Sequence, residues 1–379
     1  MKVLFIASYS GTSGANHSLI NLIKILKTKG VEPYVIIPTS GKLEKELMEN
    51  KIPYKKIRLY NWIVSIDQIS KKENIKWLIK SLINYWQELR IYLLIKKKKI
   101  KVMHINAVTA AWGLNAAQKN NVPIVWHIRE FLEEDLNKKF RNRNSAIKKL
   151  NKANVIIAIS KSVEKKYSKI INKAKLITIY NGIDHNKFSN IENDIFNKDT
   201  ITVTIAGRIV KEKGHKEVIY AIQKVIDMGV TNIKLLIVGN EGDFNFISQI
   251  EELVFGQNLD NHVHFLGYRG DMENIWSQTD IAIISSKAEA FGRVTIEAMM
   301  GGALVLGANT GGTIELINDK YGLIYEQGNY KSLADNIIYA INNKAEMKVI
   351  AKQAKINANK NFTALMNAEN IFNVYKSLK

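Results

Sequence analysis

Short apolar runs alternate with longer amphipathic stretches along residues 1–185. Val3–Ala7 is continuously apolar, and apolar residues at helical spacing follow from Leu19 to Leu26, before a glycine at Gly30. Short apolar runs bounded by turns and separated by helices are typical of buried parallel strands. The further runs in this half are Val35–Ile37, Val102–Ile105, Ile124–His127, Val155–Ile159 and Leu176–Ile179.

A second series of the same kind fills residues 201–306. Its expected strands are Ile201–Ala206, Lys234–Val238, Val263–Leu266, Ile281–Ile284 and Leu304–Leu306. Two such series predict an α/β protein of two Rossmann-like domains with a cleft between them. We expect an N-terminal domain over residues 1–185 and a C-terminal domain over residues 186–362. The last helix, residues 363–379, is expected to cross back onto the first domain.

Composition narrows the class of protein. The chain of 379 residues is 46% hydrophobic and 24% charged, as folded globular domains are. It contains no cysteine, so disulfides and thiolate chemistry are excluded. The first residues lack a signal-peptide pattern, and no apolar run reaches the roughly 18 residues that span a bilayer. We therefore expect a cytoplasmic protein, either soluble or peripheral at the inner face of the cell membrane.

The positive charge is confined to the first half of the chain. Residues 1–190 contain 36 Lys and Arg against 13 Asp and Glu, a net charge of +23. Residues 191–379 contain 19 against 22, a net charge of −3. A genomic bias toward lysine would load both halves alike. The asymmetry favours a basic N-terminal surface that faces an anionic partner, with nucleic acid and an acidic membrane as candidates.

The segment Asn74–Lys101 joins large apolar residues, among them Trp77, Tyr85 and Trp86, to the lysine run Lys96–Lys99. A crossover helix packed on the sheet accounts for most of these apolar residues. The alternative is an interfacial helix whose aromatic and lysine side chains contact a membrane.

The first candidate ligand site follows the strand at Ile201–Ala206. Residues 206–214 read Ala-Gly-Arg-Ile-Val-Lys-Glu-Lys-Gly and precede an expected helix, the place where open α/β sheets bind ligands. Gly207 allows a turn and a close approach of a ligand to the backbone. Arg208 offers a planar guanidinium and Lys213 a point charge, which together suit a diphosphate. The alternative is a solvated basic turn.

The second candidate site follows the strand at Ile281–Ile284. Residues 289–297 read Glu-Ala-Phe-Gly-Arg-Val-Thr-Ile-Glu. Gly292 stands where a helix is expected to begin, and backbone amides at a helix N-terminus favour a phosphate. The spacing of Glu289 and Glu297 places them at opposite ends of one ligand, one at a sugar hydroxyl and the other at a ribose. The alternative is two solvated surface acids.

A glycine turn, Gly311-Gly312-Thr313-Ile314-Glu315, precedes another expected helix and either lies under a phosphate or caps that helix. In order, the motifs Gly-Arg-x4-Lys-Gly, Glu-x-Phe-Gly-x4-Glu and Gly-Gly-Thr-x-Glu resemble glycosyltransferase family 4, and the resemblance covers essentially the whole chain. It implies the GT-B fold, with two Rossmann-like domains facing across a cleft. It also implies retention of anomeric configuration, no metal or other cofactor, and a nucleotide-sugar donor, by default a UDP-hexose.

The resemblance assigns roles to individual residues. Arg208 and Lys213 would hold the donor diphosphate and stabilise the leaving group. Glu297 would bind the ribose hydroxyls, and Glu289 would bind the sugar ring. His127 matches a family histidine near the transferred sugar.

Other positions are expected to bind the donor through the backbone. Tyr268 stands in a turn where such proteins read the base, and Gly14 with Ala15 falls in the N-terminal loop that approaches the diphosphate. The remaining donor-binding candidates are Gly207, Phe291, Gly292, Arg293 and Val294.

The expected reaction breaks the bond from the anomeric carbon to the phosphate through an oxocarbenium-like state. The departing phosphate takes the acceptor proton on the same face, and Glu289 as a covalent nucleophile is the second version. In place of a metal ion, Arg208, Lys213 and the helix N-terminus at Gly292 would balance the diphosphate charge.

The resemblance implies a glycan or lipid-diphosphate-linked acceptor in the synthesis of a capsule, exopolysaccharide or similar surface polysaccharide. An acceptor at an anionic membrane would account for the basic half without nucleic acid. The alternatives are a sugar-nucleotide epimerase or phosphorylase on the same fold, a nucleic-acid-binding protein, and a non-catalytic binding subunit.

Overall fold

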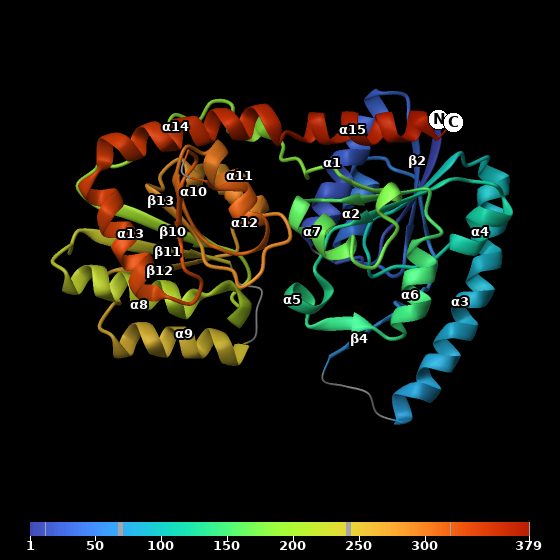
Figure 1. The fold of residues 1–379 in the computed structure, drawn as a ribbon, viewed down its shortest axis with the longest axis horizontal. Helices are drawn as coiled ribbons and strands as arrows, with labels where there is room; N and C mark the ends of the chain where they lie inside the picture. The colour runs from blue at the N-terminus through green and yellow to red at the C-terminus, as the bar shows by residue number, and fades with distance from the viewer. Residues whose placement is uncertain (12, 67–70, 240–243, 319, 379) are drawn as a thin grey trace. The chain divides into compact units, whose positions relative to one another are not determined.

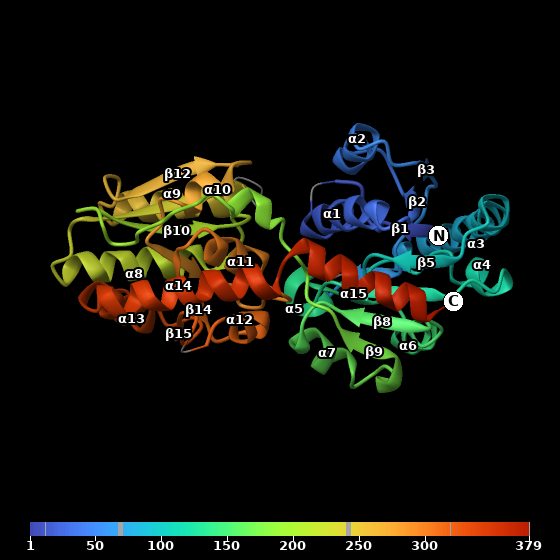
Figure 2. The ribbon, with the colours of Figure 1, turned by 90° about the horizontal axis from the view of Figure 1, so that it is seen from above.

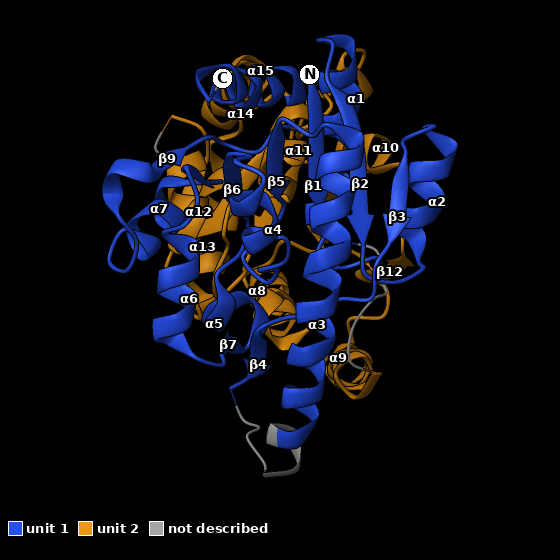
Figure 3. Ribbon diagram, turned by 90° about the vertical axis from the view of Figure 1, so that its right-hand side faces the viewer, with its two compact units in different colours: residues 1–182, 364–379 blue, residues 183–363 orange. Residues whose placement is uncertain are grey.

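The computed structural model divides into two compact units, shown in different colours in Figure 3. Unit 1 comprises residues 1–182 and 364–379, and unit 2 comprises residues 183–363. The structure describes residues 1–11, 13–66, 71–239, 244–318 and 320–378. Each unit is an α/β layer structure built on its own parallel sheet.

Unit 1 contains a parallel sheet in the order β3-β2-β1-β5-β6-β8-β9, of which Figure 2 labels β3, β2, β1, β5, β8 and β9 from above. Its strands are β1 (Lys2–Ile6), β2 (Glu32–Ile37), β3 (Tyr54–Lys56), β5 (Val102–Ile105), β6 (Ile124–Ile128), β8 (Val155–Ala158) and β9 (Leu176–Thr178). The α-helices of this unit are α1 (Gly14–Thr28), α2 (Lys42–Glu49), α3 (Lys71–Lys98), α4 (Leu114–Lys119), α5 (Leu132–Leu136), α6 (Arg143–Leu150), α7 (Lys161–Tyr167) and α15 (Ala364–Ser377).

The apolar runs of the first half all form strands, but the sequence did not reveal three short ones. The edge strand β3 has largely exposed side chains, so it carries no apolar run. The other two, β4 (Ile63–Ser65) and β7 (Lys138–Phe140), form a separate antiparallel ribbon. Each of the three has only three residues, too few to show a periodic pattern.

The C-terminal helix α15 is part of the core of unit 1. Ala368, Ile371 and Tyr375 are fully buried and belong to the same hydrophobic cluster as Leu22 and Leu26 of α1. Helix α1 begins cleanly because the Ser13 side chain accepts a hydrogen bond from the Asn16 amide. The apolar stripes of α1 and α15 thus cover one another and one face of the sheet.

Unit 2 contains a parallel sheet in the order β12-β11-β10-β13-β14-β15 (Figure 1). The strands are β10 (Ile201–Ala206), β11 (Ile233–Val238), β12 (Val263–Gly267), β13 (Ile281–Ile284), β14 (Leu304–Ala308) and β15 (Leu323–Tyr325), of which the three-residue edge strand β15 was not expected. The α-helices are α8 (His215–Asp227), α9 (Phe244–Gly256), α10 (Met272–Trp276), α11 (Arg293–Met300), α12 (Gly311–Leu316), α13 (Tyr330–Asn342) and α14 (Lys344–Asn361).

The strand order of unit 2 reverses direction next to β10. Strand β10 pairs with β11 on one side and with β13 on the other. The connections that leave β10 and β13 therefore depart in opposite directions, and their carboxyl ends border a crevice in which open α/β sheets bind ligands. Both motif-bearing loops of the sequence, residues 207–214 and 285–292, begin at these two strand ends.

Within the described residues, no helix combines the length and the apolar composition needed to cross a membrane. Helix α3, which contains most of the segment Asn74–Lys101, runs from Lys71 to Lys98.

We expect the Ile371→Ala variant to lower the free energy of unfolding of unit 1 by about 2–4 kcal/mol, because it leaves a cavity in a closed core. The Ile356→Ala variant is the control, since Ile356 is an isoleucine of α14 that is 59% exposed, and we expect a change below about 0.5 kcal/mol. Urea denaturation followed by tryptophan fluorescence measures the effect, because five of the six tryptophans lie in unit 1. Equal effects of the two substitutions would contradict a core role for α15.

Candidate functional site

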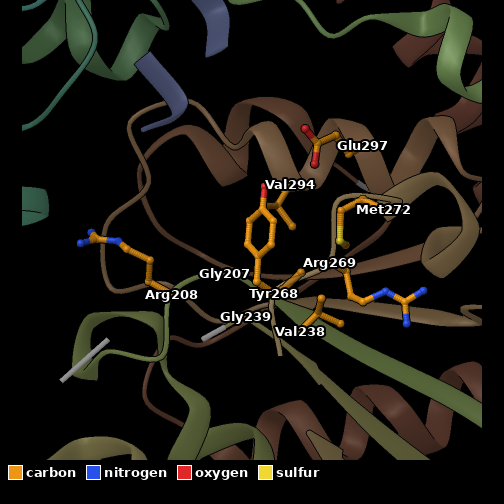
Figure 4. A pocket seen from close by; sticks show the side chains of 10 residues that line it. Gly207, Arg208, Val238, Gly239, Tyr268, Arg269, Met272, Val294 and Glu297 are labelled. Atoms are coloured by element: carbon orange, nitrogen blue, oxygen red, sulfur yellow. The ribbon is translucent and has the colours of Figure 1, made fainter. Parts of the chain in front are cut away.

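A pocket of about 200 Å³ opens at the carboxyl ends of the strands of unit 2. Figure 4 shows Tyr268 with its ring pointing toward Val294, while Arg208 and Arg269 extend to opposite sides. Of the residues expected from the sequence, the pocket brings together Gly207, Arg208, Tyr268, Val294 and Glu297.

The floor of this pocket depends on a contact between two glycines. Gly207 follows β10 and Gly239 follows β11, both with φ near 145°. A Cβ atom on Gly239 would lie 1.9 Å from the carbonyl oxygen of Gly207, so no larger residue fits. Sequence reasoning found Gly207 and missed Gly239, although its place directly after a buried strand is the same signal. The pocket is also lined by Ala206, Val238, Arg269 and Met272. Arg269 forms a bidentate ion pair with Asp271.

Lys213 and Glu289 form a second group, which does not line this pocket. The Lys213 Nζ atom donates to Glu289 Oε2 at 3.0 Å and to Ser286 Oγ at 3.2 Å. The Ser285 hydroxyl donates to the Lys213 carbonyl at 2.7 Å. These contacts connect the loop after β10 to the loop after β13. The two charged residues that the sequence singled out separately are therefore direct partners.

The turn at Gly311 and Gly312 contacts the backbone of the loop that carries Glu289. The Gly312 amide donates to the Glu289 carbonyl at 2.6 Å, and the Thr310 hydroxyl donates to the Ser286 carbonyl at 2.9 Å. Gly311 has φ 45°, and a Cβ atom there would lie 2.4 Å from the Glu289 carbonyl oxygen. The third motif of the sequence thus fixes the backbone of the second.

The helix α11 begins directly after this loop. Gly292 is its N-cap and provides no side-chain cap, so the first amides of α11 and the positive end of its dipole are available to an anion. Phe291 does not reach the pocket: its side chain is buried and its ring lies 6.1 Å from that of Phe362. Arg293 donates to Glu297 at 3.2 Å, one turn along the helix.

Glu297 lies in a place that disfavours a negative charge. Burial raises the pKa of its carboxyl group above 4.5, and the neighbouring Arg293 opposes that shift. Arg293 therefore keeps an acceptor oxygen of Glu297 oriented at the pocket wall. Among the residues that the structure describes, no three His, Asp or Glu side chains are grouped so that they could hold a metal ion.

The remaining candidates, Gly14, Ala15 and His127, lie in unit 1. The buried side chains of Asn106 and Arg129 connect Ala15 to His127. The Asn106 side chain donates to the Ala15 carbonyl at 3.1 Å and accepts from Arg129 Nε at 2.9 Å. Arg129 also donates to Asn181 Oδ1 at 2.5 Å, and its Nη2 atom lies 3.2 Å from His127 Nδ1. The sequence alone assigned no role to Arg129, Asn106 or Asn181.

Arg129 determines which ring nitrogen of His127 carries the proton. A guanidinium group only donates hydrogen bonds, so His127 Nδ1 accepts and the proton of the neutral ring is on Nε2. Burial holds the pKa of His127 well below 6.5, and the positive charge of Arg129 acts in the same direction. Nε2 is buried and has no partner among the described residues. His127 therefore presents a neutral N–H donor.

Glu130, which follows Arg129, is a partly buried acid. Its Oε2 atom accepts from the Val108 amide at 3.2 Å and from the Arg129 amide at 3.1 Å. Burial raises the pKa of Glu130 to about 7, although both hydrogen bonds oppose the shift. This carboxyl group holds the turn that follows β6.

Comparison with known protein families covers nearly the whole chain in two parts. The family described as "Glycosyltransferase Family 4" matches residues 12–187, and the family described as "Glycosyl transferases group 1" matches residues 186–357. The chain is 28% identical over 235 residues to the "Capsular polysaccharide biosynthesis glycosyltransferase CapM" of Staphylococcus aureus, covering 59% of this chain and 61% of CapM. It is 28% identical over 236 residues to "Uncharacterized glycosyltransferase MJ1607" of Methanocaldococcus jannaschii, covering 58% and 59%. The chain therefore spans about three-fifths of the length of these curated relatives.

Among solved structures, the fold is similar to that of Anabaena Alr3699/HepE in complex with UDP. The TM-score is 0.82 at 23% sequence identity, and the match covers 100% of both chains. At this level of identity the likeness establishes the fold.

We expect Glu130 to make stability depend on pH. Because its pKa is raised to about 7 in the folded chain from an ordinary 4.5, the folded state binds a proton that the unfolded state has lost between these values. The contribution of Glu130 to the free energy of unfolding should therefore fall by roughly 1 kcal/mol per pH unit as the pH rises from about 5 to 7, whereas the lowered pKa values of the buried His104, His127 and His215 act in the opposite direction below about 6.5. Chemical denaturation of the wild type and of the Glu130→Gln variant across this range should show the Glu130 contribution as the difference between their slopes. An unchanged slope would mean that Glu130 is ionised throughout.

Proposed function

Because the chain belongs to glycosyltransferase family 4 and has the GT-B fold, we propose that it is a retaining hexosyltransferase. The donor is a nucleotide sugar, most simply a UDP-sugar, and the product enters a cell-surface polysaccharide. The observation that carries the proposal is the position of two groups at the carboxyl ends of β10 and β13: Arg208 and Glu297 line the pocket, and Lys213 pairs with Glu289 between the two loops that follow these strands.

The pocket suits the nucleoside end of such a donor. Tyr268 and the glycine floor give it a flat, apolar interior, which matches a base. Glu297, at the opposite wall, presents carboxylate oxygens that accept hydrogen bonds from ribose hydroxyls. The choice of uridine is supported by the neighbour Alr3699/HepE, which is described in complex with UDP and with UDP-glucose.

The charges around the pocket suit a diphosphate without a metal ion. Arg208 is exposed at the mouth of the pocket, and the N-terminus of α11 offers backbone amides. Lys213 has three donor hydrogens, of which Glu289 and Ser286 take two. The third remains to bind a phosphate oxygen, while Glu289 keeps one oxygen for a sugar hydroxyl.

The transfer breaks the bond between the anomeric carbon and the β-phosphate oxygen and forms a bond to the acceptor oxygen on the same face. The leaving phosphate receives the acceptor proton. Lys213 and Arg208 lower the barrier because they neutralise the charge that develops on that phosphate. The role of His127 near the transferred sugar is part of the proposal through the family resemblance, and its neutral ring adds no positive charge beside the oxocarbenium-like centre.

The acceptor we propose is a glycan or a saccharide linked to a lipid diphosphate and met at an anionic membrane. The support for this part is the charge of residues 1–190, with 36 Lys and Arg against 13 Asp and Glu. A basic surface raises the local concentration of such an acceptor.

We expect the Lys213→Ala variant to lower turnover about a hundredfold or more, since a key charge stabiliser of the leaving group is lost. The matched control is Lys211→Ala, because Lys211 lies on the same short turn but is exposed and has no contact with Glu289. Initial rates of donor consumption with saturating UDP-sugar measure both variants. Near-normal turnover of the Lys213→Ala variant would refute the proposed role.

A calorimetric titration tests the donor site itself. We expect saturable binding of UDP in preference to GDP, unchanged by EDTA because no metal carries the diphosphate charge. Arg208→Ala should weaken the binding about tenfold or more, as expected for a lost charge-assisted contact. Preference for GDP would correct the nucleotide, and binding that requires a divalent ion would overturn the metal-independent mechanism.

A further inference from the structure

Helix α3 has one face that unit 1 buries. Ile91, Leu94 and Ile95 are part of the buried interior. Glu88 turns inward, and its carboxylate accepts from the Gly113 amide at 2.7 Å and from the Ala116 amide at 3.0 Å. These contacts anchor the C-terminal half of α3 on α4. Figures 1 and 3 show that the N-terminal part of α3 projects beyond the sheet of its own unit.

The opposite face of α3 carries an exposed apolar stripe. At 100° per residue, its seven large members fall within an arc of about 100°. Each is between 44% and 66% exposed. The stripe consists of Ile75, Leu78, Leu82, Tyr85, Trp86, Leu89 and Leu93.

Not every large apolar residue of α3 is left exposed. Trp77, which lies on another face of the same helix, is covered by the guanidinium of Arg141 at 4.8 Å from its ring, whereas Trp86 is 66% exposed. A continuous apolar band of this length on one helix marks a contact surface. Its occupant has to match what surrounds the stripe.

The surroundings of the stripe are basic. Within α3, Lys and Arg outnumber Asp and Glu by eight to two, and the inward-turned Glu88 is one of the two acids. Helical periodicity places Lys96 and Lys97 on the same face as the stripe, at its C-terminal end, and Arg90 beside it. An apolar stripe with aromatic residues and flanking cations is the pattern of a helix that lies in the headgroup region of a bilayer.

We propose that the stripe of α3 binds the surface of an anionic lipid bilayer, with its apolar side chains among the acyl-chain ends and its cations at the phosphates. The main competing occupant is a second copy of this chain. Two such stripes in contact would bring the lysines of both copies together with no exposed acid on the described part of α3 to compensate, which charge repulsion opposes.

This surface deepens the proposed function, because it brings unit 1 to the place where a lipid-linked acceptor resides. It rests on that function for the identity of the acceptor alone. Lipid binding and nucleotide binding involve different units, so each can be measured when the other fails.

The test is sedimentation of the full-length protein with phosphatidylglycerol-containing vesicles and with pure phosphatidylcholine vesicles. We expect a preference of about tenfold or more for the anionic vesicles, reduced several-fold by Lys96→Gln/Lys97→Gln and by salt. Leu78→Gln/Leu82→Gln should weaken binding about tenfold or more. Both leucines are well exposed, 59% and 63%, so these variants should fold and bind UDP as the wild type does.

The matched control is Val349→Gln/Ile356→Gln, which changes two exposed apolar residues of α14, 55% and 59% exposed. We expect unchanged vesicle binding for it. Equal binding to both lipids, or an equal loss in the α14 control, would overturn the proposal. If Leu78→Gln/Leu82→Gln converts a dimer to a monomer in light scattering and leaves vesicle binding intact, the stripe is instead an interface between copies.

Discussion

The candidate donor site depends on one ion pair, Lys213 with Glu289, because it joins the loop after β10 to the loop after β13. The partners are 76 residues apart in sequence, and each follows a different strand of the same sheet. The pair is half-buried, with side chains 29% and 20% exposed, so its Coulomb attraction is weakened by solvent but still stronger than on an open surface. The Ser286 hydroxyl also accepts from the Lys213 ammonium group, and the Ser285 hydroxyl donates to the Lys213 carbonyl.

Close backbone packing restricts the conformations of the loops that carry this ion pair. The turn at Gly311 and Gly312 lies so near the backbone of Glu289 that only glycine fits, and Gly239 does the same for Gly207 at the floor of the pocket. These contacts leave the loops few alternative positions. In the proposed role, a rigid site binds the diphosphate with little rearrangement, which is the condition under which fixed charges lower a barrier most.

The sequence predicted the fold well where strands are buried, because a buried parallel strand carries a continuous apolar run. It failed for β3, β4, β7 and β15, which have three residues each and whose stability comes from neighbouring segments rather than from their own pattern. For the candidate site, single motifs predicted which residues belong to it, and the structure adds the contacts between these residues. The pairing of Lys213 with Glu289 and the support of Glu289 by Gly312 are long-range contacts that no local spacing encodes.

Long-range contacts that local spacing does not encode also determine the surroundings of His127 in unit 1. They come from distant strands and from the end of the chain. Arg129 fixes the tautomer of His127 only because Asn106 and Asn181 hold its guanidinium. On the other side, the His127 ring is 5.4 Å from that of His104.

His104 in turn connects the buried polar group around His127 and Arg129 to the last helix. The hydroxyl of Tyr375, in α15, lies 2.6 Å from His104 Nδ1. Burial lowers the pKa of His104 to about 3, so both rings stay neutral and do not repel one another. Because a charged imidazole in this layer would face the fixed charge of Arg129, neutrality is the condition for packing the two histidines beside it. Helix α15 therefore closes the core of unit 1 and completes the polar layer in which His127 is held.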